Sequence, residues 1–193
     1  EKLSHKTKNK EKKELEDIKA MAFKDGITDF RSSDMSYYSE KLKKEQYDLD
    51  EEYYRPYFEQ QSVLNGFFDF LYQMFNIKFT KANTPAWDEK VKVYDLSEDG
   101  KTIARIYIDL EARKEKRGGA WMNNWHSYYK DSKGELNLPT AYIVGNFPQS
   151  TEETPSLLRH SDVVTLFHEM GHALHHLLSK IEEPFVSGIS GVA

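Results

Sequence analysis

The spacing of apolar residues changes near Asn83, and this change constrains the fold more than any other feature of the sequence. Before it, apolar residues of segment 50–77 recur at intervals of three and four, which predicts one long amphipathic helix. After it, short β-type runs at 91–93 and 103–108 flank a turn cluster at 97–100, which predicts a β-hairpin. The chain therefore passes from helical to β structure at this point.

A strand and a further amphipathic helix are expected after the hairpin. Residues 141–147 form a short apolar run that stops at Pro148, which predicts a strand. From 162 to about 181 apolar residues again recur at three and four, and Ser161 is a suitable N-cap, which predicts a helix. Because the strand directly precedes this helix, we expect the two to lie side by side, with one edge of the strand free to pair with an extended peptide. The alternative is an interior strand paired on both edges, since a short apolar run is consistent with either position.

The fold class that these patterns predict is mainly α-helical with a small β-sheet. No repeat and no long Pro-, Gly- or Ser-rich linker divides the 193 residues, so we expect a single domain. In it, residues 1–82 form a helical bundle, with an exposed charged helix over 6–19 and another that begins near Asp34. Residues 83–193 form the hairpin, the edge strand and the last helix.

The composition argues against several classes of function. The chain has 27 Lys and Arg against 32 Asp and Glu, so it lacks the basic surface that binds nucleic acid or an anionic membrane. No apolar run approaches the roughly 20 residues that span a bilayer, and the first twenty residues lack the apolar centre of a signal peptide. We therefore expect a cytoplasmic location. Since the chain has no cysteine, any metal ion must be held by histidine and carboxylate.

The last predicted helix contains the pattern H-E-x-x-H, formed by His168, Glu169 and His172. Side chains four residues apart on a helix lie about 40° apart around the axis and roughly 6 Å along it, so both imidazoles can bind one ion. Zn²⁺ suits such ligands and lowers the pKa of a bound water towards roughly 7. The carboxylate of Glu169 is next to the site and can act as the general base. The motif predicts one zinc ion and hydrolysis of peptide bonds.

No third zinc ligand can be identified within the helix. The metzincin pattern requires Gly at position 175 and His at position 178, whereas this chain has His175 and Leu178. His175 lies about 10 Å along the axis from His168, too far to bind the same ion, so we assign it a role in packing or in supporting the ligands. Glu182 and Glu183 follow the motif too closely for the chain to turn back, and we expect them at the helix end.

Two other interpretations of the motif remain open. The first is a non-enzymatic helical binding module that carries a degenerate, metal-free H-E-x-x-H pattern, because short motifs also arise by chance. The second is a related gluzincin carboxypeptidase, whose zinc helix has a similar sequence. Bound zinc in a ratio of one ion per chain separates the first alternative from a metallopeptidase.

Three segments carry a resemblance to a known family. Residues 167–175, Phe-His-Glu-Met-Gly-His-Ala-Leu-His, resemble the zinc helix of the thimet oligopeptidase family of metallopeptidases. Residues 107–122, which include Arg-Gly-Gly-Ala-Trp, are similar to a strand and loop of that family, and residues 37–42 to its upstream helix. The resemblance covers nearly the whole chain. It implies a mainly helical, zincin-like enzyme with a deep channel, which cleaves short peptides.

The resemblance also implies roles for the motif residues and a limit to the chain. His168 and His172 match the family's zinc ligands, and Glu169 matches its catalytic base. The family's third ligand is a glutamate on a later helix, which would fall beyond Ala193. The chain is then expected to be an internal fragment of one catalytic domain, inactive or nearly so by itself. We expect it to self-associate through helix faces that are left unburied. The apolar residues expected to be buried in this way include Val163, Leu166, Leu174 and Leu177.

Overall fold

Two units make up the chain in the computed structural model, Glu1–Glu51 and Glu52–Ala193. The structure describes residues 2–47 and 51–190. Among the described helices, none combines the length and the apolar character that a bilayer crossing requires. Each unit is considered by itself below.

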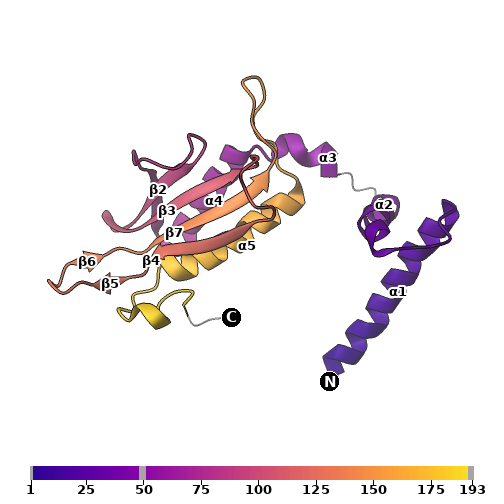
Figure 1. Ribbon diagram of the computed structural model, residues 1–193, viewed down its shortest axis with the longest axis horizontal. Helices are drawn as coiled ribbons and strands as arrows, with labels where there is room; N and C mark the ends of the chain where they lie inside the picture. Colours follow the sequence, from indigo (N-terminus) through magenta and orange to yellow (C-terminus); the bar gives the residue numbers. More distant parts are fainter. Residues whose placement is uncertain (1, 48–50, 191–193) are drawn as a thin grey trace. The chain divides into compact units, whose positions relative to one another are not determined.

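The first unit is a pair of helices, α1 (Lys2–Lys24) and α2 (Met35–Tyr47), joined by a loop that ends in the short 3-10 helix η1 (Ser32–Asp34) (Figure 1). The carboxylate of Asp34 accepts a hydrogen bond from the backbone N–H of Arg31 at 2.8 Å, which closes the start of η1. A small core holds the two helices together because both have one apolar face. Its buried members are Ile18, Met21, Ala22 and Tyr38.

The single helix expected over 50–77 is broken in the structure. The short helix α3 (Glu51–Tyr54) passes into the 3-10 helix η2 (Arg55–Tyr57), and a separate helix α4 (Gln60–Phe75) follows. Residue 50 lies outside the described residues. Pro56 accounts for the break because it has no N–H to donate within a helix, so the chain turns before α4 begins.

Both ends of α4 are defined by local hydrogen bonding. The carboxylate of Glu59 accepts hydrogen bonds from the N–H groups of Gln61 and Ser62 at 2.8 and 2.6 Å, and so caps the first turn. Asn76 has φ +57°, a left-handed conformation that ends the helix. The chain then enters strand β1 (Ile77–Lys81) directly. The part of the chain that was expected to be helical therefore contains a strand.

A five-stranded sheet with the order β1-β2-β3-β7-β4 forms the centre of the second unit (Figure 1). β2 and β3 form the predicted hairpin, and β3 pairs in parallel with β7, whereas the other pairs are antiparallel. A two-stranded ribbon of β5 (Tyr129–Lys130) and β6 (Leu136–Asn137) lies between β4 and β7 in the sequence. The remaining strands are β2 (Lys92–Glu98), β3 (Lys101–Glu111), β4 (Trp121–His126) and β7 (Thr140–Phe147).

The prediction that the strand at 141–147 has a free edge is wrong. β7 is paired on both sides, since Ile143 lies opposite Ile108 of β3 and opposite Met122 of β4. Its nearly continuous apolar sequence is typical of an interior strand. The edge position beside it belongs to β4, a segment rich in asparagine and tryptophan for which no strand was predicted.

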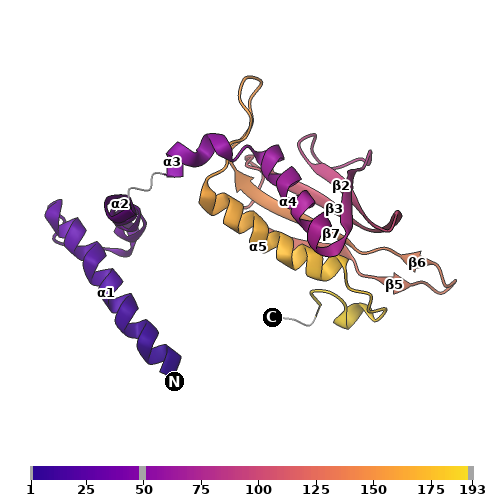
Figure 2. The same ribbon diagram turned by 180° about the vertical axis from the view of Figure 1, so that it is seen from behind.

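Helices α4 and α5 (His160–Leu177) cover one face of the sheet, as Figure 2 shows. α4 packs beside β1, and α5 lies along β7 and β4, so the predicted neighbourhood of strand and last helix is confirmed. The architecture is thus α/β, with more helix than strand and a larger sheet than expected. The core between helices and sheet includes Leu64, Leu71, Ile106, Ile143, Leu166, Met170, Ala173 and Leu177.

The last helix differs from its predicted bounds at both ends. It begins one residue before Ser161, and its N-cap is Arg159, whose N–H donates to the carboxylate of Asp162 at 2.9 Å. It ends at Leu177 rather than near 181, because the following segment folds back on the helix end. There the hydroxyl groups of Ser179 and Ser187 are 3.2 Å apart.

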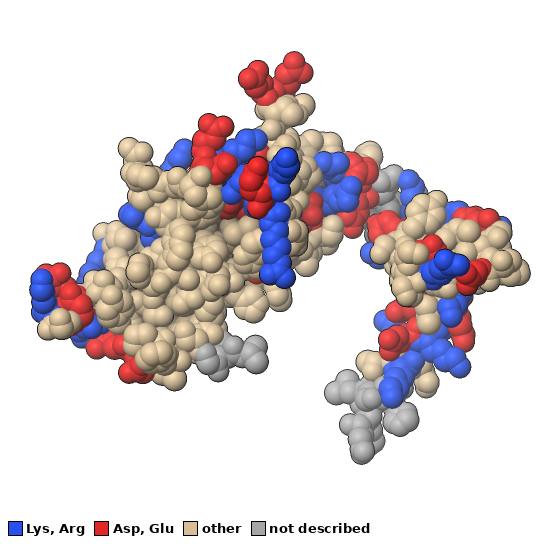
Figure 3. Space-filling view, in the orientation of Figure 1, with Lys and Arg blue, Asp and Glu red and all other residues tan. Residues whose placement is uncertain are grey.

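The opposite face of the sheet carries a cluster of four aromatic rings, Trp87, Tyr107, Trp125 and Tyr142. The ring centroid of Trp125 lies 4.8 Å from that of Tyr107 and 5.0 Å from that of Tyr142. Trp87 and Trp125 are 45% and 49% exposed, so α4 and α5 do not cover them. In Figure 3, uncharged side chains dominate the middle of this face.

Candidate active site

The two motif histidines meet on the outer face of α5. The Nε2 atoms of His168 and His172 lie 3.2 Å apart, and both side chains are exposed. Two nitrogens that bind one Zn²⁺ at about 2.0 to 2.1 Å with a tetrahedral angle lie about 3.3 Å apart. The observed separation therefore fits two ligands of a single tetrahedral ion.

Buried neighbours fix the direction of these two histidines. Leu166, Met170 and Ala173 are at most 1% exposed and pack on the sheet, so the helix cannot rotate about its axis without losing this contact. His168 and His172 are consequently held on the side of the helix that faces away from the core. The packing of one apolar stripe thus sets the position of both imidazoles.

Glu169 lies between the ligand side and the buried side of α5 and is half-buried. Within the described part of the chain, its carboxylate makes no hydrogen bond and no ion pair, unlike Asp162 in the first turn of the same helix. A carboxylate without a partner keeps its lone pairs available as proton acceptors. This is the property that a general base needs.

Beside His168 and His172, the described residues bring no third candidate metal ligand into place. Within residues 2–47 and 51–190, no three His, Cys, Asp or Glu side chains come together in a way that could hold a metal ion. Glu182 lies beyond the end of α5, where it pairs with Lys130 at 2.5 Å. His175, which we expected to pack or to support the ligands, is exposed, and the buried histidine is its neighbour His176.

The four residues predicted to mediate self-association belong to the core of the chain itself. Leu166 and Leu177 are 1% and 2% exposed, and Val163 and Leu174 pack against the same cluster. The prediction was wrong because these residues belong to the apolar stripe that packs on the sheet. That stripe includes Met170, which lies inside the H-E-x-x-H motif. Large apolar side chains that are exposed on α4 and α5 are Phe70, Tyr72, Met74, Phe75, Val164 and Phe167.

A buried carboxylate anchors the loop that leads into the edge strand. Asp109 is 2% exposed and accepts hydrogen bonds from Trp87 at 2.8 Å, from both terminal nitrogens of Arg113 at 2.7 Å, and from Lys116 at 3.0 Å. Burial opposes ionisation of this group, but the hydrogen bonds from Arg113, Trp87 and Lys116 outweigh it and lower the pKa of Asp109. The sequence analysis did not predict this network, although Asp109 and Arg113 are only four residues apart within the segment that resembles the family.

The glycine-rich part of the same loop is held from the other side by Asn146 of β7. Its amide nitrogen donates to the backbone oxygens of Arg117 and Gly119 at 2.8 and 2.7 Å. Gly119 has φ +94°, which residues with a side chain rarely adopt, so the glycine is required for this turn. The start of β4 is therefore fixed relative to β7.

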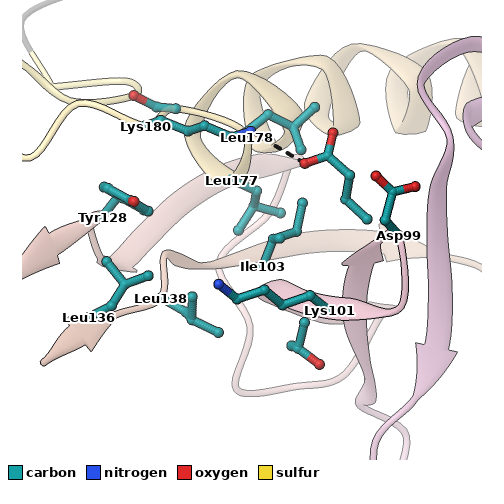
Figure 4. A pocket seen from close by; sticks show the side chains of 12 residues that line it. Asp99, Lys101, Ile103, Tyr128, Leu136, Leu138, Leu177, Leu178 and Lys180 are labelled. Carbon is teal, nitrogen blue, oxygen red and sulfur yellow. Dashed lines mark hydrogen bonds and ion pairs between the residues drawn. The ribbon is translucent and has the colours of Figure 1, made fainter.

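A separate hollow of about 490 Å³ lies at the C-terminal end of α5 (Figure 4). Its walls combine aliphatic with polar and charged side chains, and the ion pair between Lys180 and Glu98, at 3.3 Å, crosses one side. His168 and His172 do not line it, so it is not part of the metal-ligand pair. The aliphatic walls are formed by Ile103, Leu136, Leu138, Leu177 and Leu178.

Comparison with known proteins identifies the family. The family model described as "Peptidase family M3" matches residues 1–193. The chain belongs to peptidase family M3. The resemblance to thimet oligopeptidases inferred from residues 167–175 is thereby confirmed at the level of the family.

Curated M3 relatives include proteins of two named activities. The chain is 36% identical over 193 residues to "Oligopeptidase A" of Salmonella typhimurium and 38% identical over 158 residues to "Dipeptidyl carboxypeptidase" of Escherichia coli. It is also 34% identical over 167 residues to "Thimet-like oligopeptidase" of Dictyostelium discoideum. These alignments cover 98%, 80% and 83% of the chain, respectively.

The same M3 relatives are much longer than this chain. The alignments cover 28%, 23% and 24% of oligopeptidase A, dipeptidyl carboxypeptidase and thimet-like oligopeptidase, respectively. The chain therefore corresponds to about a quarter of each relative, and this quarter contains the H-E-x-x-H helix and the sheet beside it.

Proposed function

We propose that the protein carrying this chain is a zinc metallopeptidase that hydrolyses short peptides. The observation that supports this most directly is the 3.2 Å separation of the Nε2 atoms of His168 and His172. Glu169, which follows His168 in the sequence, has a carboxylate without a partner among the described residues. Membership of peptidase family M3 supports the same reaction class.

The chemistry assigned to the chain's own residues is limited and specific. His168 and His172 hold the ion through Nε2, and Glu169 accepts a proton from the attacking water and delivers it to the departing amine nitrogen. When bound, zinc supplies a Lewis acid that polarises the scissile carbonyl and makes water more acidic. The apolar stripe of α5, which packs on the sheet, keeps the three side chains in fixed positions relative to one another during both proton transfers.

The edge strand β4 is suited to hold the substrate. It is the last strand of the sheet next to α5, so its outer N–H and C=O groups are unpaired within the sheet of the described chain. An extended peptide can pair with such an edge and become a further strand. This role was first assigned to residues 141–147, and the pairing of that strand on both sides excludes it there.

We further propose that the third zinc ligand comes from a part of the longer protein outside the described residues. Two histidines alone leave a tetrahedral site incomplete, so the chain by itself should be inactive or nearly so and should bind zinc weakly. In this proposal, residues 1–82 and 83–193 belong to one catalytic domain of a cytoplasmic enzyme that needs neither nucleic acid nor membrane. Apolar side chains such as Phe70 and Phe167 should promote self-association of the isolated chain.

The mode of cleavage has two candidates. The similarity to a protein named dipeptidyl carboxypeptidase supports removal of dipeptides from the carboxyl end, as an alternative to internal cleavage. Digestion of a peptide of eight residues by the longer protein, followed by mass spectrometry over time, separates the two. Only successive loss of two residues from the carboxyl end would support the first mode.

A direct experiment tests the proposed function itself. The longer protein, prepared with one equivalent of zinc, should hydrolyse an internally quenched peptide, lose activity in a chelator and regain it with zinc. Replacement of His168 by Ala should abolish both the bound zinc and the hydrolysis. Full hydrolysis by a metal-free protein would contradict the proposal and favour another catalytic site.

A further inference from the structure

His176 is the buried histidine of α5, with a side chain that is 1% exposed. Its Nε2 lies 2.8 Å from the backbone oxygen of His126, the last residue of β4. A carbonyl oxygen can only accept a hydrogen bond, so Nε2 carries the proton and donates it. His176 follows His172 by four residues, which places it about 6 Å further along the axis on the same flank of the helix.

The other nitrogen of the ring faces the returning chain. Nδ1 has no hydrogen-bond partner within the described residues. Gly188, with φ +59°, packs against it so closely that a Cβ atom there would lie 2.3 Å from Nδ1. Burial lowers the pKa of His176, and the nearby His175 lowers it further, against the hydrogen bond to His126. The imidazole is therefore held as a neutral ring between the end of β4 and the turn at Gly188.

The end of β4 needs such a support because its pairing with β7 is irregular there. Trp121 to Asn124 pair in regular register with β7, but the register shifts between Asn124 and His126. A register shift of this kind leaves a residue without its ladder partner and bends the strand. The hydrogen bond from His176 acts at the residue immediately after this shift. It ties the strand to α5 where the ladder is weakest.

We propose that His176 is a positioning residue of the peptidase site. It holds the outer end of β4 against α5, so that a peptide paired with the strand edge keeps a constant position relative to His168, His172 and Glu169. The kinetic consequence rests on the proposed function, whereas the tether between helix and strand does not. A displacement of about 1 Å at a reacting centre can lower the rate by about 100-fold.

Two substitutions of His176 separate hydrogen bonding from space filling. His176→Leu fills the site without a donor, and His176→Gln keeps a side-chain N–H. In the longer protein, His176→Leu should retain one zinc per chain but lower kcat/KM by about tenfold or more, mainly through KM for peptides that reach along β4. His176→Gln should recover most of this loss. The matched controls are His175→Leu and His175→Gln, which change an exposed neighbour and should leave kcat/KM unaltered.

Hydrogen exchange provides a readout that does not depend on activity. Amides of residues 121–126 should exchange at least about tenfold faster in the His176→Leu chain than in the unsubstituted chain, and at nearly the original rate in His176→Gln. Nitrogen-15 spectra of the unsubstituted chain should show the tautomer with the proton on Nε2 of His176. Because this measurement uses only the unsubstituted chain, it tests the hydrogen bond even if the Leu variant fails to fold.

Several results would overturn the proposal. Unchanged exchange in β4 with His176→Leu would show that the strand does not depend on the tether. Equal losses in the Leu and Gln variants would show that the side-chain N–H does not carry the effect. A proton on Nδ1 in the spectrum would rule out the hydrogen bond to His126. If the unsubstituted longer protein shows no chelator-sensitive hydrolysis, the proposed function fails, and the exchange rates alone decide whether His176 holds β4.

Discussion

Arg113 donates two hydrogen bonds of 2.7 Å, one from each terminal nitrogen, to the two carboxylate oxygens of Asp109. Asp109 is buried in the sheet, whereas the side chain of Arg113 is 23% exposed and reaches it from the loop that leads towards β4. The pair thus connects the end of β3 with the glycine-rich turn before the edge strand.

Replacement of Asp109 by Asn should destabilise the chain strongly. The substitution leaves Arg113 and Lys116 without their buried counter-charge, and breaking a buried pair in this way typically costs about 3–5 kcal/mol. Urea unfolding, followed by far-UV circular dichroism, measures the loss. The matched control is Asp95→Asn on the same sheet, because Asp95 and its partner Arg105 are 28% and 37% exposed and should contribute less than about 1 kcal/mol. Equal losses in the two variants would contradict the assigned role.

The contribution of Asp109 to stability should depend on pH in a defined direction. Its pKa in the folded chain is lowered, so the folded state binds fewer protons than the unfolded state near pH 4. The contribution is fully present above the unfolded pKa of about 3.9 and is lost as the pH falls through the lower, folded pKa. The difference in urea midpoint between the original chain and Asp109→Asn should therefore be constant near neutral pH and shrink in acid. A difference that grows in acid would contradict this.

Replacement of Glu169 by Gln should separate catalysis from metal binding. The ligands His168 and His172 remain, so the longer protein should keep its zinc, while loss of the proton acceptor should lower kcat by about 10²–10⁴-fold. Atomic absorption and steady-state kinetics on the same preparation give both values. Glu182→Gln is the control, since Glu182 is exposed and pairs with Lys130 away from the motif. Near-normal hydrolysis by the Glu169→Gln protein would exclude the assigned base.

Replacement of Gly188 by Ala should destabilise the end of α5. The added Cβ would lie 2.3 Å from Nδ1 of His176, and φ +59° costs a residue with a side chain about 1–2 kcal/mol before this clash is counted. We expect a total loss above about 2 kcal/mol in urea unfolding. Gly66→Ala in α4 is the control, because nothing lies within 4 Å of its added Cβ and alanine favours a helix by roughly 0.5–1 kcal/mol. A Gly188→Ala chain as stable as the original would show that the turn can relax away from His176.

The isolated 193-residue chain should bind zinc much more weakly than the longer protein. With two histidines the ion lacks the charge and the geometry that a carboxylate ligand adds, so affinity should fall by several orders of magnitude. Equilibrium dialysis of both proteins against zinc at the same pH measures the difference. Tight binding of one ion per isolated chain, together with peptide hydrolysis, would mean that a carboxylate within the chain completes the site.

The last helix and its motif could be predicted from the sequence because both depend on local spacing. Apolar residues at three and four place His168 and His172 on one flank of any helix that forms, whatever surrounds it. The same spacing contained a signal for His176 that was missed. It follows the buried Ala173 by three residues, so it lies at the margin of the buried stripe, whereas His175 lies outside it.

Strand order could not be predicted because it depends on partners far away in the sequence. The run at 141–147 reads equally well as an edge or an interior strand, and β4, which covers it, contains two asparagines that weaken any strand prediction. The split between α3 and α4 was missed for a different reason. The apolar spacing continues across Pro56, and the cap formed by Glu59 is recognised only once its bonds to Gln61 and Ser62 are seen.

The antiparallel pairing of β4 with β7 gives the proposed site a polarity. A peptide that adds to the outer edge of β4 in antiparallel fashion must run in the same direction as β7. Its amino end then lies beside His126, where His176 holds the strand, and its carboxyl end lies beside Trp121, next to the turn at Gly119. Of the two ends of a bound peptide, the carboxyl end is therefore the one that approaches the loop before β4. Arg113 and Lys116 of this loop are already paired with Asp109, whereas Arg117 is exposed and makes no ion pair among the described residues. Arg117 is thus the cation that a free terminal carboxylate would meet there.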